Sequence, residues 1–143
     1  MACGSFALIC IDTTVLVDEF RAKGDLAAPV NQALIRHAAE SLLIPVAAAG
    51  EFLDGAFMVS EERVQEALRL LRGRQVVQSD LEIAERYGDL VARLRKQNLL
   101  AGRSQNDLWI SATAISRGAR LLTRNTRHFS DIVGLELLKY GPE

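Results

Sequence analysis

Short hydrophobic runs alternate along the chain with longer segments in which hydrophobic residues recur every three or four positions. The short runs are typical of strands buried on both faces of a parallel sheet, because such strands have no polar face. They predict strands at residues 6–11, 42–45, 75–78 and 119–123, and a fifth, with the weakest pattern, at 135–138.

The segments between these runs have the spacing and the end signals of helices. Ser60 is expected to cap a helix that ends at Gly73, and Asp80 to begin a longer helix that runs through Leu94. A nearly all-apolar helix, hence a central one, is predicted at 106–117. The remaining segments are an amphipathic stretch at 13–20, helices at 29–40 and 46–57, and loops at 21–25 and 99–105.

Strands and helices alternate without an internal repeat, linker or low-complexity segment. Such alternation predicts a three-layer α/β/α sandwich around a parallel sheet of about five strands, in one domain that spans residues 1–143. In sheets of this kind ligands bind beyond the carboxyl ends of the strands, so functional side chains are expected there.

The composition narrows the possible functions. Of the 143 residues 49% are hydrophobic, and the net charge of −1 excludes a strongly basic nucleic-acid binder, so any contact with a nucleic acid such as RNA must come from a local patch. Two cysteines without a Cys-x-x-Cys pair, and only two histidines, argue against a zinc site and suit a reducing compartment. No apolar run reaches the roughly 18 residues of a membrane span, and the N-terminus lacks a charged signal-peptide region. A cytoplasmic location is therefore expected.

Three acidic residues lie where this fold predicts chemistry. Asp12 ends the first strand, Glu51 lies in the helix after the second strand, and Asp107 lies in the first turn of the apolar helix. Three carboxylates at one rim repel a phosphodiester unless they hold a cation. Mg²⁺ and Mn²⁺ prefer such oxygen ligands, keep several waters and bind phosphate. The sequence therefore predicts a metal site of Asp12, Glu51 and Asp107.

Each acid also has a structural interpretation. Asp12 and Asp107 stand at helix starts, where a carboxylate can cap free N–H groups, and a helical glutamate is usually a solvated charge. Glu51, however, is flanked by the apolar residues 47–50 and 52–53, a setting in which an ionised carboxylate needs a partner. Hydroxyl groups near the same rim can orient metal ligands or serve as caps. They belong to Thr13, Thr14, Ser104 and Thr123.

Several segments resemble the motifs of the PIN-domain family. The opening strand motif is similar to Ile-Asp-Thr-Thr-Val-Leu at 11–16, and the second acid motif to Gly-Glu-Phe at 50–52. The third motif resembles Asn-Asp-Leu-Trp-Ile-Ser-Ala at 106–112. The fourth-strand segment resembles Leu-Leu-Thr-Arg-Asn-Thr-Arg-His-Phe at 121–129, and the last strand Gly-Leu-Glu-Leu at 134–137. The pattern covers almost the whole chain and is closest to VapC-type toxins of toxin–antitoxin pairs.

This resemblance implies a five-stranded parallel sheet, Mg²⁺ or Mn²⁺ as cofactor, and endonucleolytic cleavage of RNA. It also implies a homodimer and a partner antitoxin protein, in keeping with apolar segments such as residues 52–59 that a lone monomer does not fully bury. Asn125 stands where many PIN domains carry a fourth acid. Its carbonyl can position a metal-bound water but adds no charge, so a second metal ion is harder to hold. The residues implied to support the metal ligands are Thr13, Thr14, Thr123 and Asn125.

Alternative functions have less support. An Asp-x-Asp phosphotransferase needs an acid where Thr14 stands, and a receiver domain needs an Asp at the end of the third strand, which closes with Val77 and Gln78. An inactive PIN scaffold that binds RNA or protein is the alternative that Asn125 leaves open. His128 is interpreted as a surface or capping side chain. Candidate contacts to RNA phosphates are Arg21, Lys23, Arg103, Arg124 and Arg127.

Overall fold

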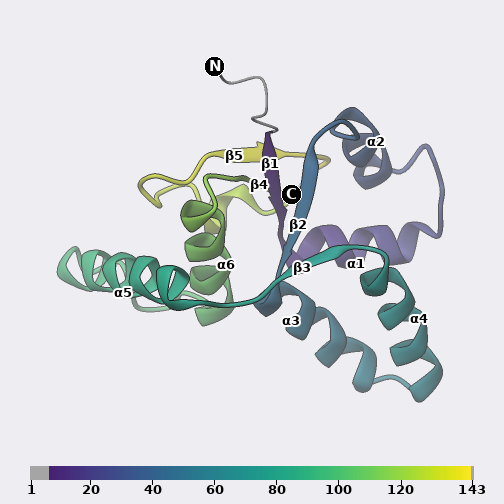
Figure 1. Cartoon of the computed structure of the whole chain (residues 1–143), viewed down its shortest axis with the longest axis horizontal. Coiled ribbons are helices and arrows are strands. Elements are labelled where there is room, and N and C mark those ends of the chain that lie inside the picture. The colour runs from purple at the N-terminus through teal and green to yellow at the C-terminus, as the bar shows by residue number, and fades with distance from the viewer. Residues whose placement is uncertain (1–6, 143) are drawn as a thin grey trace.

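The computed structural model of the chain describes residues 7–142. At its centre lies a sheet of five strands in the order β3-β2-β1-β4-β5, in which every pair of neighbours is parallel (Figure 1). The strands are β1 (Leu8–Ile11), β2 (Ser41–Pro45), β3 (Gln75–Val77), β4 (Arg120–Thr123) and β5 (Leu137–Lys139). The predicted parallel α/β class is therefore confirmed.

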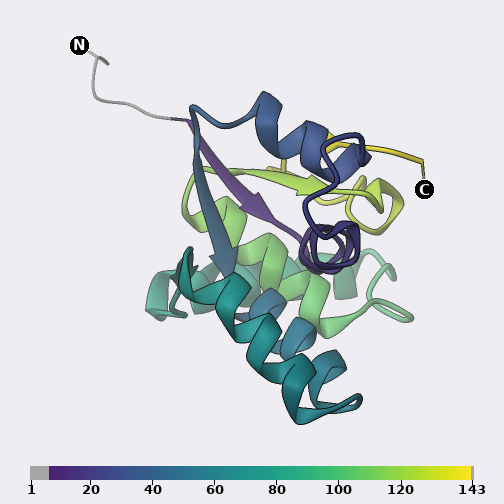
Figure 2. The same cartoon turned by 90° about the vertical axis from the view of Figure 1, so that its right-hand side faces the viewer.

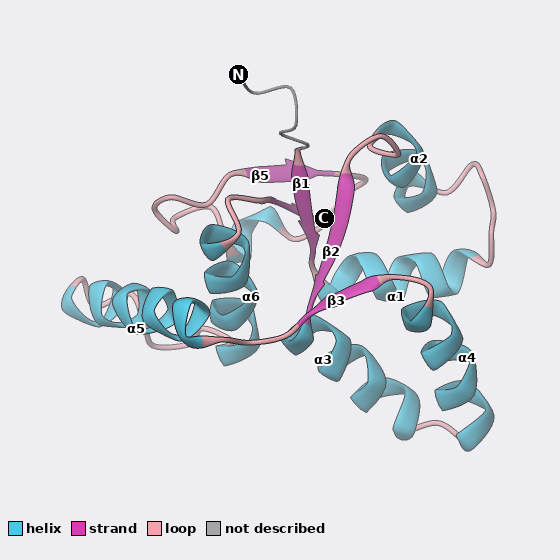
Figure 3. Ribbon diagram, in the orientation of Figure 1, coloured by secondary structure: helices cyan, strands magenta, loops and turns pink. Residues whose placement is uncertain are grey.

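Helices cover both faces of this sheet. The helices are α1 (Thr13–Ala22), α2 (Pro29–Arg36), α3 (Val46–Phe57), α4 (Glu61–Arg72), α5 (Leu81–Lys96) and α6 (Gln105–Ser116), and a 3-10 turn, η1, spans Thr126–His128. Helix α6 packs against β1, β2 and β4 with α5 packed against it, while α1 and α2 lie on the other side of the sheet (Figure 2). The hairpin of α3 and α4 extends away from the sheet below β2 and β3 (Figure 3).

Local hydrogen bonds explain where several helices begin. The Ser60 hydroxyl accepts a hydrogen bond from the Arg63 N–H at 3.1 Å, and Asp80 Oδ1 accepts one from the Ile83 N–H at 2.9 Å. Ser60 is thus the N-cap of α4 that the sequence predicted, and Asp80, which was predicted to begin the next helix, is the N-cap of α5. The predicted helix at 46–57 coincides with α3.

Other element boundaries differ from the prediction. The predicted loop at 21–25 begins late, since α1 continues to Ala22 before Lys23 turns left-handed with a φ of 48°. The predicted helix at 29–40 ends at Arg36, and Glu40 instead accepts a hydrogen bond from Arg120 of β4 at 2.8 Å. The fifth strand lies one to two residues later than predicted, because Leu121 pairs with Leu137. Phe6, in the first predicted strand, and Cys3 lie outside the described residues.

The core forms around β1 and α6. Ile9, Cys10 and Ile11 are fully buried, and burial raises the pKa of the free Cys10 thiol to about 12, so this thiol stays protonated. The buried hydroxyls of Ser111 and Thr113 donate to carbonyl groups one turn earlier in α6, which lets this helix cross the core. Among residues 7–142, no helix has the length and hydropathy needed to cross a membrane.

Candidate active site

Asp12 lies where β1 ends and α1 begins, and is only 3% exposed. Although it occupies the N-cap position of α1, its side chain makes no capping hydrogen bond there. Its Oδ2 atom instead accepts hydrogen bonds from the hydroxyls of Thr14, at 2.9 Å, and Thr123, at 2.8 Å. Burial raises the pKa of Asp12, and these two hydroxyls oppose that rise. The Asp12 carboxylate is thus held by two hydroxyl groups and does not cap α1.

A network of threonines joins two strand ends around this carboxylate. Thr123 Oγ1 accepts a hydrogen bond from the Asn125 N–H at 3.0 Å, and Thr14 Oγ1 accepts one from the Arg124 N–H at 3.3 Å. The end of β4 is therefore fixed to the start of α1. Asn125 takes part in this network through its backbone.

Glu51 projects from α3 and is exposed. The apolar setting expected for it is wrong, because Ala48, Ala49 and Phe52 are buried in the core whereas the Glu51 side chain is exposed. Its Oε1 atom accepts a 2.6 Å hydrogen bond from the hydroxyl of Thr13. This bond ties α3 to the start of α1, next to Asp12, and the charge of Glu51 raises the pKa of Asp12 further.

Asp107 lies in the first turn of α6, where Ser104, and not Asp107, is the capping residue. Its side chain is 18% exposed. Burial raises the pKa of Asp107 to about 6, with the charge of Asp12 as the next cause and the charge of Glu51 acting in the same direction. Although they are distant in sequence, the carboxylates of Asp12, Glu51 and Asp107 therefore repel one another across one site.

The donor groups of this site fit a hard divalent cation. Among the described residues, no three acidic, histidine or cysteine side chains converge into a ready-made metal cage. Mg²⁺ does not require one, because it is usually held by one or two carboxylates while waters complete its shell. Burial first, and then the charges of Asp12 and Glu51, raise the pKa of Asp107, and a bound cation would offset both effects on the charged form.

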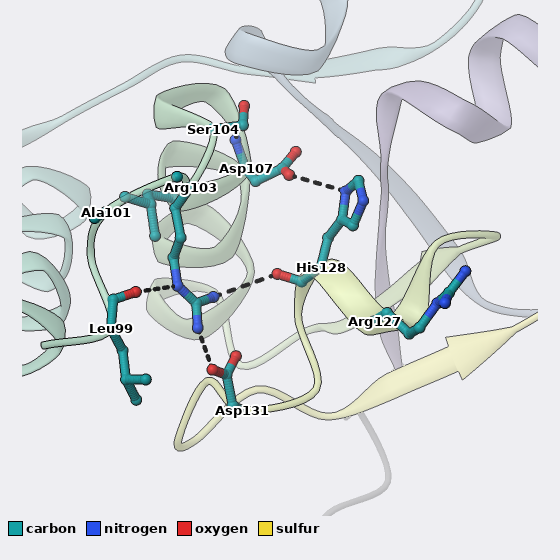
Figure 4. Close-up of a pocket in the computed structure, with 10 residues that line it drawn as sticks. Leu99, Ala101, Arg103, Ser104, Asp107, Arg127, His128 and Asp131 are labelled. Carbon is teal, nitrogen blue, oxygen red and sulfur yellow. Dashed lines mark hydrogen bonds and ion pairs between the residues drawn. The ribbon is translucent and has the colours of Figure 1, made fainter. Parts of the chain in front are cut away.

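A pocket of about 350 Å³ opens beside Asp107, between the α5–α6 loop and η1 (Figure 4). His128 lines it, with its Nδ1 atom 3.3 Å from Asp107 Oδ2. His128 is exposed, as predicted, but it is not a capping residue, since its partner is a candidate metal ligand. Its position just after the fourth predicted strand, at the edge where the acids gather, was the signal in the sequence.

The basic residues predicted to contact RNA divide into those that form ion pairs with acidic residues and those that are exposed. Arg124 forms an ion pair with Asp18 at 2.7 Å, and Arg103 forms one with Asp131, so a carboxylate of the protein offsets the charge of each arginine. Arg21, Lys23 and Arg127 are exposed, and Arg127 also lines the pocket beside Asp107.

The fold and this site define a parallel α/β domain with an acidic centre at the carboxyl ends of its strands. The family model of the PIN domain matches residues 9–135. The chain is 32% identical over 118 residues to VapC ribonuclease Mb1587 of Mycobacterium bovis, a match that spans 82% of this chain and 87% of that protein. The chain therefore belongs to the PIN-domain family, as a relative of the VapC ribonucleases.

Solved structures show the same fold. VapBC2 from Rickettsia felis, bound to a DNA fragment from its promoter, superposes with a TM-score of 0.80 at 23% identity, covering 94% of this chain and 99% of that chain. A toxin–antitoxin complex from Klebsiella pneumoniae superposes with a TM-score of 0.70 at 25% identity, covering 96% of this chain and 99% of that chain. The predicted five-stranded PIN-like sheet is thereby confirmed.

Proposed function

We propose that this chain is a divalent-metal-dependent endoribonuclease that acts in the cytoplasm as the toxin of a toxin–antitoxin pair. The observation that carries the proposal is that Asp12, Glu51 and Asp107 gather where β1 and β2 end and α6 begins, in a chain that is related over most of its length to a VapC ribonuclease. Carboxylates kept close at a cost to the fold are typical of residues retained for function.

In this proposal the three carboxylates hold Mg²⁺ or Mn²⁺, which when bound polarises a phosphate oxygen and lowers the pKa of a water ligand. The chain's own residues keep the carboxylates in position. The hydroxyls of Thr14 and Thr123 both donate to the Oδ2 atom of Asp12, and these two hydrogen bonds fix the orientation of the carboxylate. Because Asn125 adds no charge at the fourth position, we propose one tight metal site and not two.

The decisive test is cleavage of single-stranded RNA by the purified chain, with Mn²⁺ and with a chelator. Wild type should cleave only with metal, and Asp12→Asn should lose at least about a hundredfold of that activity, as expected for an electrostatic contribution of this kind. Asp54→Asn is the matched control, because Asp54 is exposed on α3 one turn from Glu51. A metal-independent wild type, or an Asp12→Asn variant at near wild-type rate, would refute the proposal.

The partners are also proposed. Phe57, Met58 and Val59, at the turn between α3 and α4, are 70%, 81% and 61% exposed, an apolar surface that a partner chain or a second copy would cover. We propose a homodimer that binds an antitoxin. Light scattering at micromolar concentration should give the mass of two chains, and expression of the chain alone should slow growth. A harmless monomer contradicts both expectations.

A further inference from the structure

Side-chain contacts hold the walls of the pocket beside Asp107 in place. Its walls come from the α5–α6 loop on one side and from η1 with the segment that follows it on the other, and Arg103 links the two. The Arg103 guanidinium donates to the Leu99 carbonyl at 2.8 Å and to the His128 carbonyl at 3.4 Å, and it pairs with Asp131 (Figure 4). Because one side chain joins both walls, the pocket exists before any ligand binds.

The lining combines an apolar wall with cationic side chains. Leu99 contributes an apolar side chain that is 43% exposed, and the buried Leu108 continues this surface. Arg103 and Asp131 offset each other's charge, and His128 and Arg127 supply the other basic groups. A surface of this kind matches the two parts of a nucleotide, since a base packs on apolar side chains and a phosphate accepts hydrogen bonds from basic groups.

The volume and position of the pocket agree with such a ligand. About 350 Å³ falls in the range of small-molecule sites, roughly 300–1,000 Å³. The pocket adjoins Asp107, and its basic residue His128 contacts that carboxylate directly. A nucleotide held here lies next to the acidic centre.

We propose that this pocket is a subsite for one nucleotide of the RNA, adjacent to the bond that is cleaved, with His128 binding its phosphate and Leu99 its base. The inference rests on the proposed ribonuclease function and assigns part of the substrate to residues outside the acidic centre. His128 is thus a substrate-binding residue, and Arg103 is a positioning residue that holds the pocket walls together.

The chain's histidine content allows a direct binding test. His37 and His128 are the two histidines, and His37 lies at the end of α2, paired with Glu40. Imidazole C–H proton resonances are recorded at fixed pH with Mg²⁺ and assigned with the His37→Ala variant. Each of the four ribonucleoside 5′-monophosphates, which have no bond to cleave, is then titrated, and inorganic phosphate is titrated separately. The His128 resonance should move and saturate with at least one nucleotide, while that of His37 stays in place.

Variants connect binding with turnover. His128→Ala should weaken nucleotide binding and raise KM for RNA by about tenfold, the equivalent of one charge-assisted hydrogen bond, with kcat within about threefold of wild type. Leu99→Ala should raise KM by a smaller factor, whereas His37→Ala and Leu26→Ala, which alters a leucine that is 67% exposed elsewhere, should leave KM unchanged. Thermal melts verify that each variant folds.

Each outcome separates this inference from the proposed function. Nucleotide-specific shifts at His128 together with the KM increase support the subsite. If wild type cleaves RNA while nucleotides leave His128 unmoved, or His128→Ala leaves KM unchanged, the subsite is refuted and the ribonuclease stands. If inorganic phosphate moves His128 with the same affinity as every nucleotide, the pocket binds anions only and the subsite is likewise refuted. If wild type does not cleave RNA with metal, it is the proposed function that fails.

Discussion

Replacement of Asp107 by Asn should stabilise the metal-free protein. Burial and the charge of Asp12 raise the pKa of Asp107 from 3.8 to about 6, so its charged form is less stable in the folded protein than in the unfolded chain. Asn has nearly the same shape and carries no charge. Ser104 supplies the N-cap of α6 in either case, so the substitution does not remove a cap.

The size of the effect follows from the pKa. A rise of about two units corresponds to about 3 kcal/mol of unfolding free energy at neutral pH. Solvent screening at this partly exposed group, and the loss of its contact with His128, reduce the expected gain to about 1–2 kcal/mol. For a chain of this length that is a rise in Tm of about 3–6 °C.

The pH dependence of the folded protein's stability follows from the direction of this pKa shift. Because the folded-state pKa is above the unfolded one, this group makes the folded protein most stable below about pH 4 and progressively less stable up to about pH 6. The Tm difference between Asp107→Asn and wild type should therefore be small at pH 4, grow through pH 6 and stay constant above pH 7. The pKa of Asp12 is also raised, so this residue makes the Tm of both proteins depend on pH in the same direction.

Thermal melts from pH 4 to 8 in chelator, followed by Mn²⁺ addition at pH 7, provide the measurement. Mn²⁺ at 100 times its Kd should stabilise wild type by about 2.7 kcal/mol and the variant by far less. The Tm advantage of the variant over wild type should therefore shrink or reverse when Mn²⁺ is added. A variant that is less stable than wild type in chelator at pH 7, or that keeps the full Mn²⁺ shift, would show that Asp107 is a structural residue.

Three further substitutions test other parts of the structure. Glu51→Gln should leave Tm in chelator unchanged or slightly higher, since the residue is exposed, but should lose most of the Mn²⁺ shift; a full shift would remove Glu51 from the metal site. Thr123→Val removes the hydroxyl that donates to Asp12 and should lower the unfolding free energy in urea by about 1–3 kcal/mol, so an unchanged midpoint contradicts the network. Ile110→Ala, in the middle of α6, should cost about 2–5 kcal/mol, against at most about 0.5 kcal/mol for Leu81→Ala, whose side chain is 83% exposed; equal losses would contradict the packing of the core.

Short-range interactions explain what the sequence determined. The hydrophobic runs located the strands, because a strand of a covered parallel sheet has two apolar faces. Ser60 and Asp80 marked the starts of α4 and α5, because an N-cap bond joins residues three apart. The rule that parallel strands present their carboxyl ends at one edge was enough to place Asp12, Glu51 and Asp107 in a single hypothesis.

The tertiary structure decided what depends on register and on faces. The strand order β3-β2-β1-β4-β5 is absent from any local pattern, because each hydrophobic run can pair with any other. Glu51 has apolar neighbours in sequence and yet is exposed, since the packing of α3 against other helices determines which of its residues face the core. The contact between His128 and Asp107, and the bridge from Arg103 to Asp131, join residues of different elements. Such contacts form only when the elements have packed, because side-chain hydrogen bonds and ion pairs act over a few ångströms. No local pattern in the sequence therefore indicates them.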